Sequence, residues 1–142
     1  MTVAAVIERD SRFLLVREHS EGRLVYNQPA GHLEDNESLL EAVVRETLEE
    51  TAWRFEPEAV IGIYRWRHPH SRQTYMRVSF SGRGTAHQPG RKLDPDIDSV
   101  VWMDIDEIRA RRDELRSPLV LRTITDYLEG IAHPLSLLAD IE

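Results

Sequence analysis

Hydrophobic and polar residues alternate over several short stretches of the chain, as they do in β-strands that bury one face. We expect strands at residues 3–7, 13–16, 24–26, 60–66, 74–80 and 100–103. The polar turn at residues 9–11 would join the first two strands as a hairpin, and residues 68–71 would join the fourth strand to the fifth. Residues 82–95 are rich in glycine, proline and charge, so we predict a loop there.

Three other segments have the pattern of helices. The first follows Ser38, which fits a capping box with Glu41 because each side chain can bond the backbone N–H of the other residue. The apolar face of this helix would hold Leu40, Val43, Val44 and Thr47. Two more helices are expected at residues 105–115 and 119–131, with Pro118 beginning the last one. Strands mixed with three helices predict an α+β fold.

Length and composition restrict the class of protein. A chain of 142 residues suits a single domain, which we take as residues 1–142. The absence of cysteine excludes disulfides, thiolate metal ligands and a cysteine nucleophile. A net charge of −7 argues against a nucleic acid polymer as partner. No apolar stretch reaches the length of a membrane helix, so we expect no membrane partner and a cytoplasmic location.

The first predicted helix carries a dense group of charges. Glu46, Glu49 and Glu50 stand at positions i, i+3 and i+4, so their carboxylates would share one face. A divalent cation with oxygen ligands would relieve their repulsion, and Mg²⁺ suits this donor set better than Zn²⁺. Arg45 could fix one carboxylate by paired hydrogen bonds. Taken alone, the cluster is equally compatible with a solvated helix that has ordinary ion pairs along its surface.

The residues before this helix favour the metal site. Together with the helix they resemble the signature of the Nudix hydrolases, G-x5-E-x7-R-E-U-x-E-E-x-G-U, in which U is apolar. The matching residues are Gly31, Glu37, Arg45, Glu46, Glu49, Glu50 and Trp53. Two positions depart from the signature, because Thr47 stands where an apolar residue is usual and Ala52 replaces a glycine. Alanine resists the left-handed conformation that glycine accepts, so we expect a different helix exit at Ala52.

The resemblance implies the Nudix fold, an α/β/α sandwich around a mixed β-sheet, and an enzyme that uses Mg²⁺, with Mn²⁺ as a substitute. By family correspondence Glu46, Glu49 and Glu50 would be metal ligands, and one of them would accept a proton from the attacking water. Ala30 would offer its backbone carbonyl to the metal. Glu37 and Arg45 would orient the ligands. Substrates of this family are small molecules in which a group X is joined to a diphosphate.

A base outside the signature is also common in this family. Asp96 and Asp98 are our candidates for a further metal ligand or base, since their loop precedes the strand that contains Trp102. The alternative is that both are turn aspartates that cap backbone amides.

Three further segments narrow the resemblance to a bacterial subgroup of the family, the NudJ-type phosphatases. They are residues 26–32, residues 96–98 with Trp102, and residues 115–120. This subgroup implies a phosphatase acting on nucleoside tri- and diphosphates and on pyrophosphates of the thiamine pathway. Two alternatives stay open within the fold, a pyrophosphohydrolase of oxidised or non-standard nucleotides and a nucleotide-sensing module without activity. A third is an acidic interaction protein whose glutamate helix contacts a basic partner.

Substrate contacts are harder to assign from the sequence. The candidates for binding a ring, a polar ring edge or a phosphate are Arg23, Tyr26, Gln28, Trp66, Arg77 and Arg116. The alternatives are core packing for the aromatic residues and surface solvation for each arginine. The sequence is compatible with a monomer or a homodimer.

Overall fold

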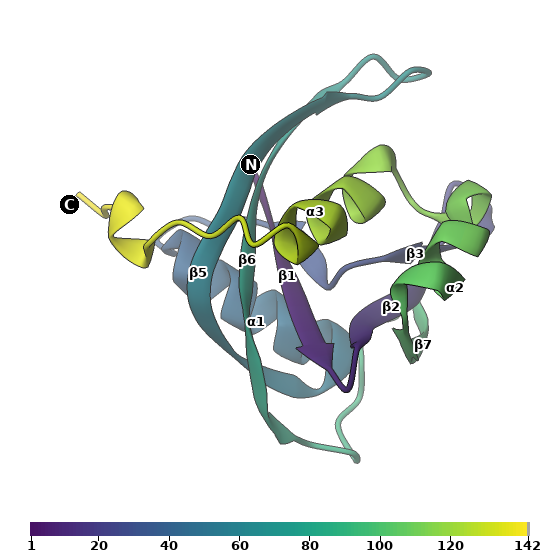
Figure 1. Ribbon diagram of the computed structural model, residues 1–142, viewed down its shortest axis with the longest axis horizontal. Coiled ribbons are helices and arrows are strands. Elements are labelled where there is room, and N and C mark those ends of the chain that lie inside the picture. The colour runs from purple at the N-terminus through teal and green to yellow at the C-terminus, as the bar shows by residue number, and fades with distance from the viewer. Residues whose placement is uncertain (142) are drawn as a thin grey trace.

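The computed structural model describes residues 1–141, and one mixed β-sheet forms its centre (Figure 1). The strands are β1 (Thr2–Arg9), β2 (Arg12–Ser20), β3 (Arg23–Asn27), β4 (Ala30–His32), β5 (Trp53–Arg67), β6 (Thr74–His87) and β7 (Ile97–Met103). The helices are α1 (Leu39–Thr51), α2 (Ile105–Ala110) and α3 (Pro118–Leu128), with 3-10 turns η1 (Arg112–Glu114) and η2 (Leu135–Leu137). None of the helices in this described range is long and apolar enough to cross a membrane.

The sheet is mixed because one of its pairings is parallel. Its strands run in the order β3-β2-β1-β6-β5, while β4 pairs with β1 and β7 pairs with β2. β1 lies parallel to β6, and the other pairings are antiparallel. Between β1 and β6 the chain passes through β2, β3, β4, α1 and β5, and α1 packs on one face of the sheet.

Each face of the sheet carries its own hydrophobic core, since successive side chains of a strand point to opposite faces. On β1, Val3, Ala5 and Ile7 pack in the core that also holds Ala42 and Val43 of α1. The other core contains Val6 of β1, Ile108 of α2, and Val120 and Ile124 of α3. In Figure 1, α3 accordingly lies in front of the strands and α1 behind them. This arrangement confirms the α+β class and the predicted α/β/α sandwich.

Helix α1 begins as the sequence predicts, but its C-terminal end differs from the one expected from the sequence. Both halves of the Ser38–Glu41 capping box are present, and Thr47 is fully buried on the face against the sheet. The expected change at the helix exit was wrong, because Ala52 adopts the left-handed conformation with φ 62° and ψ 15°. Its N–H donates to the Leu48 carbonyl, as in a glycine cap. The chain continues directly into β5, and this pairing holds Ala52 in a conformation that alanine disfavours.

Several predicted boundaries also change, including the end of the last helix, which stops at Leu128, and one short strand was not predicted. The loop predicted at residues 82–95 starts too early, because β6 continues to His87 opposite Trp53 of β5. The helix predicted at residues 105–115 ends at Ala110 and is followed by η1. β4 is too short to show a pattern in the sequence, and it forms because Ala30 and its neighbours pair with β1. In each case pairing or packing with distant residues overrides the local pattern.

Gly82 offers a test of the sheet's close packing. A Cβ at this position would overlap the backbone carbonyl of Glu56 on the neighbouring strand, which cannot move without disturbing the pairing. We therefore predict that Gly82→Ala lowers the free energy of unfolding by about 1–3 kcal/mol. Urea unfolding measures this change. Gly90→Ala is the control, since nothing lies near its new Cβ, and equal effects of the two changes would contradict the packing described.

Candidate active site

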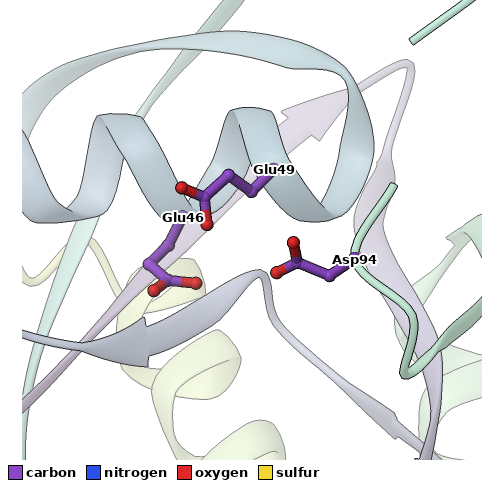
Figure 2. A group of neighbouring side chains, drawn as sticks. All are labelled: Glu46, Glu49 and Asp94. Carbon is purple, nitrogen blue, oxygen red and sulfur yellow. The ribbon is translucent and has the colours of Figure 1, made fainter. Parts of the chain in front are cut away.

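Three carboxylates from two parts of the chain meet at the end of α1. Glu46 and Glu49 come from the helix and Asp94 from the loop before β7, and one oxygen of each lies within 4.8 Å of the others. Figure 2 shows the three side chains directed toward one another. Asp94 of the loop and the two glutamates of α1 therefore form one acidic cluster.

Two backbone contacts bring Asp94 to this place. The Asp94 N–H donates to the Glu49 carbonyl at 3.1 Å, and the Gln88 N–H donates to the Ala52 carbonyl at 2.9 Å. Both acceptors lie in the last turn of α1 or at its cap, where carbonyls lack helical partners. The connection from β6 to β7 is thus attached to the C-terminal end of α1, and Asp94 faces Glu49.

Arg45 connects the acidic cluster to the segment before the helix. Its Nε donates to Glu37 at 2.6 Å and one terminal nitrogen donates to the other Glu37 oxygen at 3.0 Å, a bidentate pair. The same terminal nitrogen donates to the His32 carbonyl at 3.0 Å. Glu37 also accepts from the backbone N–H of Glu34. The Arg45 hydrogen bonds hold the pKa of Glu37 below its usual range.

The remaining terminal nitrogen of Arg45 reaches two cluster carboxylates. It donates to Glu46 at 2.8 Å and to Glu49 at 3.3 Å. Burial raises the pKa of Glu46 despite this hydrogen bond, and the charges of Glu49 and Asp94 raise it further. Burial, with the Glu49 charge next, also raises the pKa of Asp94. Arg45 therefore fixes the direction of the carboxylates without neutralising all of them.

Glu50 lies apart from these three and is more deeply buried. One of its oxygens accepts the backbone N–H of Ala30 at 2.9 Å. Burial, opposed by this hydrogen bond and assisted by the charges of Glu18 and Glu46, raises the pKa of Glu50 to about 9. A positive charge brought nearby would favour its ionised form.

This donor set suits a hard divalent cation. All the ligand atoms on offer are carboxylate oxygens, and burial together with the charges of neighbouring carboxylates raises the pKa of both Glu46 and Asp94. Glu46, Glu49 and Asp94 could hold the ion, with Glu50 beside them.

A cavity of about 390 Å³ opens beside the cluster, and several predicted site residues line it. They are Glu46, Glu50, Ala30, Asp96, Arg23, Trp66, Arg77 and Arg116, and Asp94, which was not predicted, lines the cavity with them. A second cavity of about 600 Å³ adjoins it and shares Arg23, Trp66 and Arg116. The structure thus collects four of the six candidate substrate residues around a connected space next to the acidic cluster.

Other candidates have different surroundings. Tyr26 packs in the core beneath α3. Gln28 is 1% exposed, donates to the Val120 carbonyl at 2.8 Å and accepts from Arg77. Asp98 faces Arg17 at 3.7 Å across an exposed pair. Their side chains are engaged within the protein, whereas Asp96 lines the cavity.

Two residues of the site were missed by the sequence interpretation. Asp94 lies in the loop that we had singled out, but nothing local distinguishes it from Asp96 and Asp98. Glu18 is 4% exposed on β2 and pairs with Arg116 at the cavity wall. Glu18 follows the predicted strand at residues 13–16 in a run of polar and charged residues, so no local signal in the sequence singles it out.

The family of this chain follows from its similarity to known proteins. A family model described as the NUDIX domain matches residues 1–123. The chain belongs to the Nudix family. Phosphatase NudJ of Escherichia coli (strain K12) is 37% identical over 140 residues, which cover 99% of this chain and 90% of the relative. The Shigella boydii serotype 4 phosphatase NudJ has the same identity and coverage.

Solved Nudix structures agree with the fold. A NUDIX hydrolase from Nitrosomonas europaea is 48% identical with a TM-score of 0.97, over 99% of this chain and 95% of that one. The NUDIX domain of Shewanella oneidensis NrtR, complexed with ADP ribose, is 19% identical with a TM-score of 0.73, over 92% and 87%. At 19% identity, the similarity to NrtR shows only that the two chains share a fold. Family and phosphatase relatives make this protein a hydrolase that acts on phosphoanhydride bonds.

Gly31 tests the placement of Glu46. A Cβ at Gly31 would overlap the Glu46 carboxyl group, which can swing away because it ends a flexible side chain. We predict that Gly31→Ala leaves the fold intact and lowers turnover by about tenfold or more, because the carboxylate is displaced. Steady-state kinetics and circular dichroism measure the two effects. Unchanged turnover would show that the position of Glu46 does not matter.

Proposed function

We propose that this Nudix hydrolase is a Mg²⁺-dependent phosphatase, similar to NudJ, that acts on nucleoside tri- and diphosphates and on pyrophosphates of the thiamine pathway. The observation that carries the proposal is the cluster of Glu46, Glu49 and Asp94 beside a cavity that arginines also line. The 37% identity to phosphatase NudJ over 99% of the chain supports the choice of substrates.

The metal-binding part of the proposal assigns a role to each acidic residue. Glu46, Glu49 and Asp94 would hold Mg²⁺, or Mn²⁺ in its place, together with Glu50 and the Ala30 carbonyl. A bound cation of this kind neutralises phosphate oxygens and lowers the pKa of the attacking water. Arg45 and Glu37 keep the carboxylates in position through their paired hydrogen bonds.

A carboxylate near the attacking water would accept its proton. Glu46, Glu49 and Glu50 are candidates by family correspondence, and Asp96 is a further candidate because it lines the cavity with Asp94. We keep Asp98 behind these, since it pairs with Arg17.

The organic part of the substrate would extend from the first cavity into the second. Trp66 lines both cavities, and its ring stacks on Tyr75 with centroids 5.9 Å apart and an interplanar angle of 26°. A heteroaromatic ring could lie against this pair. The cavity of about 600 Å³ falls in the range that small-molecule sites occupy.

The wider biological setting is part of the same proposal. We propose that residues 1–142 form one domain, that the protein acts in the cytoplasm as a monomer or a homodimer, and that its partner is a small phosphate ester. The net charge of −7 supports the exclusion of nucleic acid polymers.

The test is a substrate screen with Mg²⁺ against nucleoside di- and triphosphates, thiamine pyrophosphate, dinucleoside polyphosphates and ADP-ribose. We expect orthophosphate release from several di- and triphosphates, and its loss when a chelator is added.

Glu49→Gln should lower turnover by about a hundredfold or more, because it removes one ligand charge without burying a new group. Glu129→Gln, at the exposed end of α3, is the matched control and should change nothing.

Other outcomes would redirect the proposal. Release of pyrophosphate from one triphosphate would indicate a pyrophosphohydrolase of oxidised or non-standard nucleotides. Binding without turnover of any compound would indicate a sensing module. Full activity of Glu49→Gln at saturating Mg²⁺ would reject the assigned metal ligands.

A further inference from the structure

Arg77 has hydrogen-bond donors and a charge that its neighbours in the protein do not fully pair. The side chain leaves β6 toward the cavity beside the acidic cluster, and the residue is 8% exposed. One terminal nitrogen donates to Gln28 at 3.4 Å, a long hydrogen bond. The Nε is buried and has no hydrogen-bond partner among residues 1–141. Arg77 also forms no ion pair with any carboxylate of these residues.

Such a side chain is costly to the fold. A buried cation without a paired anion loses its hydration and regains little of that energy from the protein. Burial lowers the pKa of Arg77 to about 10, the Arg116 charge acts in the same direction, and the charges of Glu18 and Glu50 oppose the shift only in part. At neutral pH the guanidinium therefore keeps its charge.

The nearby carboxylate is already in use. Glu18 accepts a hydrogen bond from Arg116 and another from the Asn27 amide, at 3.3 Å for the amide. Glu50, the other buried carboxylate whose charge acts on Arg77, accepts the Ala30 N–H at 2.9 Å. Arg116 is half-exposed, and its backbone N–H donates to the Tyr26 carbonyl at 2.8 Å, which fixes the loop before α3.

Carboxylates line the same cavity. Glu46, Glu50 and Asp94 lie in its wall together with Arg77, so a ligand that fills the space meets both a candidate cation site and a guanidinium group. A phosphate group matches both, because its oxygens bind divalent cations and accept paired hydrogen bonds from guanidinium groups.

We propose that Arg77 binds the diphosphate of the substrate, donating to non-bridging phosphate oxygens in the cavity that Glu46 and Asp94 also line, with Arg116 as a second donor. This inference rests on the proposed function and assigns the residue that holds the phosphates. In this role the missing partner of Arg77 is the substrate. Glu18 holds Arg116 in place and leaves Arg77 available.

A purely structural role makes a different prediction. If Arg77 served to position Gln28 and the segment before β4, its removal would destabilise the protein with or without ligand. If it binds phosphate, its removal relieves an uncompensated buried charge, so the ligand-free protein should be as stable as before or more stable.

The experiment compares wild type with Arg77→Gln and Arg77→Lys. Arg83→Gln is the matched control, since Arg83 lies on the same strand and pairs with Glu56 and Glu58 on the surface. Methylenediphosphonate with Mg²⁺ is the probe, because it cannot be hydrolysed and has no organic group. Calorimetry measures its dissociation constant, and thermal unfolding measures the stability of each variant without it.

We expect Arg77→Gln to raise the dissociation constant by about ten- to a hundredfold, which corresponds to the free energy that hydrogen bonds to a charged group contribute. Its melting temperature without ligand should equal or exceed that of wild type. Arg77→Lys keeps a cation and should bind with intermediate affinity, and Arg83→Gln should bind like wild type. For substrates that turn over, Arg77→Gln should raise KM.

Three results would overturn the inference. The first is equal binding of the probe by wild type and Arg77→Gln. The second is loss of stability in both Arg77 variants without ligand, and the third is no binding by wild type. Turnover by wild type with unchanged kinetics in Arg77→Gln would reject this role and leave the proposed function standing. Arg77-dependent binding without turnover of any substrate would support this role and reject the proposed function.

Discussion

The hydrogen bonds of the Arg45 guanidinium hold the site together. One planar group binds Glu37 with two bonds, the His32 carbonyl with another, and the cluster residues Glu46 and Glu49 with its remaining nitrogen. It connects the segment before α1 to the helix, and it offsets part of the repulsion between carboxylates that the fold forces together. Since a planar fork fixes direction as well as charge, a lysine at this position could not replace it.

The fold brings opposite charges into the lining of one cavity. The parallel pairing of β1 with β6 sets Arg77 on a strand beside the one that receives β4, while α1 crosses the sheet and presents its glutamates nearby. The loop after β6 then returns to the end of α1 with Asp94. Carboxylates that attract a cation and a guanidinium that attracts phosphate therefore line the same cavity. The same arrangement explains how a protein with a net charge of −7 can bind an anionic substrate.

Local signals in the sequence predict α1 and its glutamates well, because capping and a spacing of three and four residues act within a few turns. Long-range contacts decide the rest. Asp94 joins the cluster through a backbone bond to Glu49, and Arg77 becomes buried only when β6 lies between β1 and β5. The left-handed Ala52 shows the limit of propensity, since pairing of the following strand outweighs the preference of alanine.

The central claim is that Glu46, Glu49 and Asp94 hold a divalent cation. Titration with Mn²⁺, followed by electron paramagnetic resonance, tests it most directly without substrate or turnover. Asp94→Asn should weaken Mn²⁺ binding by about ten- to a hundredfold, whereas Asp98→Asn, four residues away and paired with Arg17, should bind as wild type does. Wild-type affinity in Asp94→Asn, or loss of binding in Asp98→Asn alone, would contradict the account.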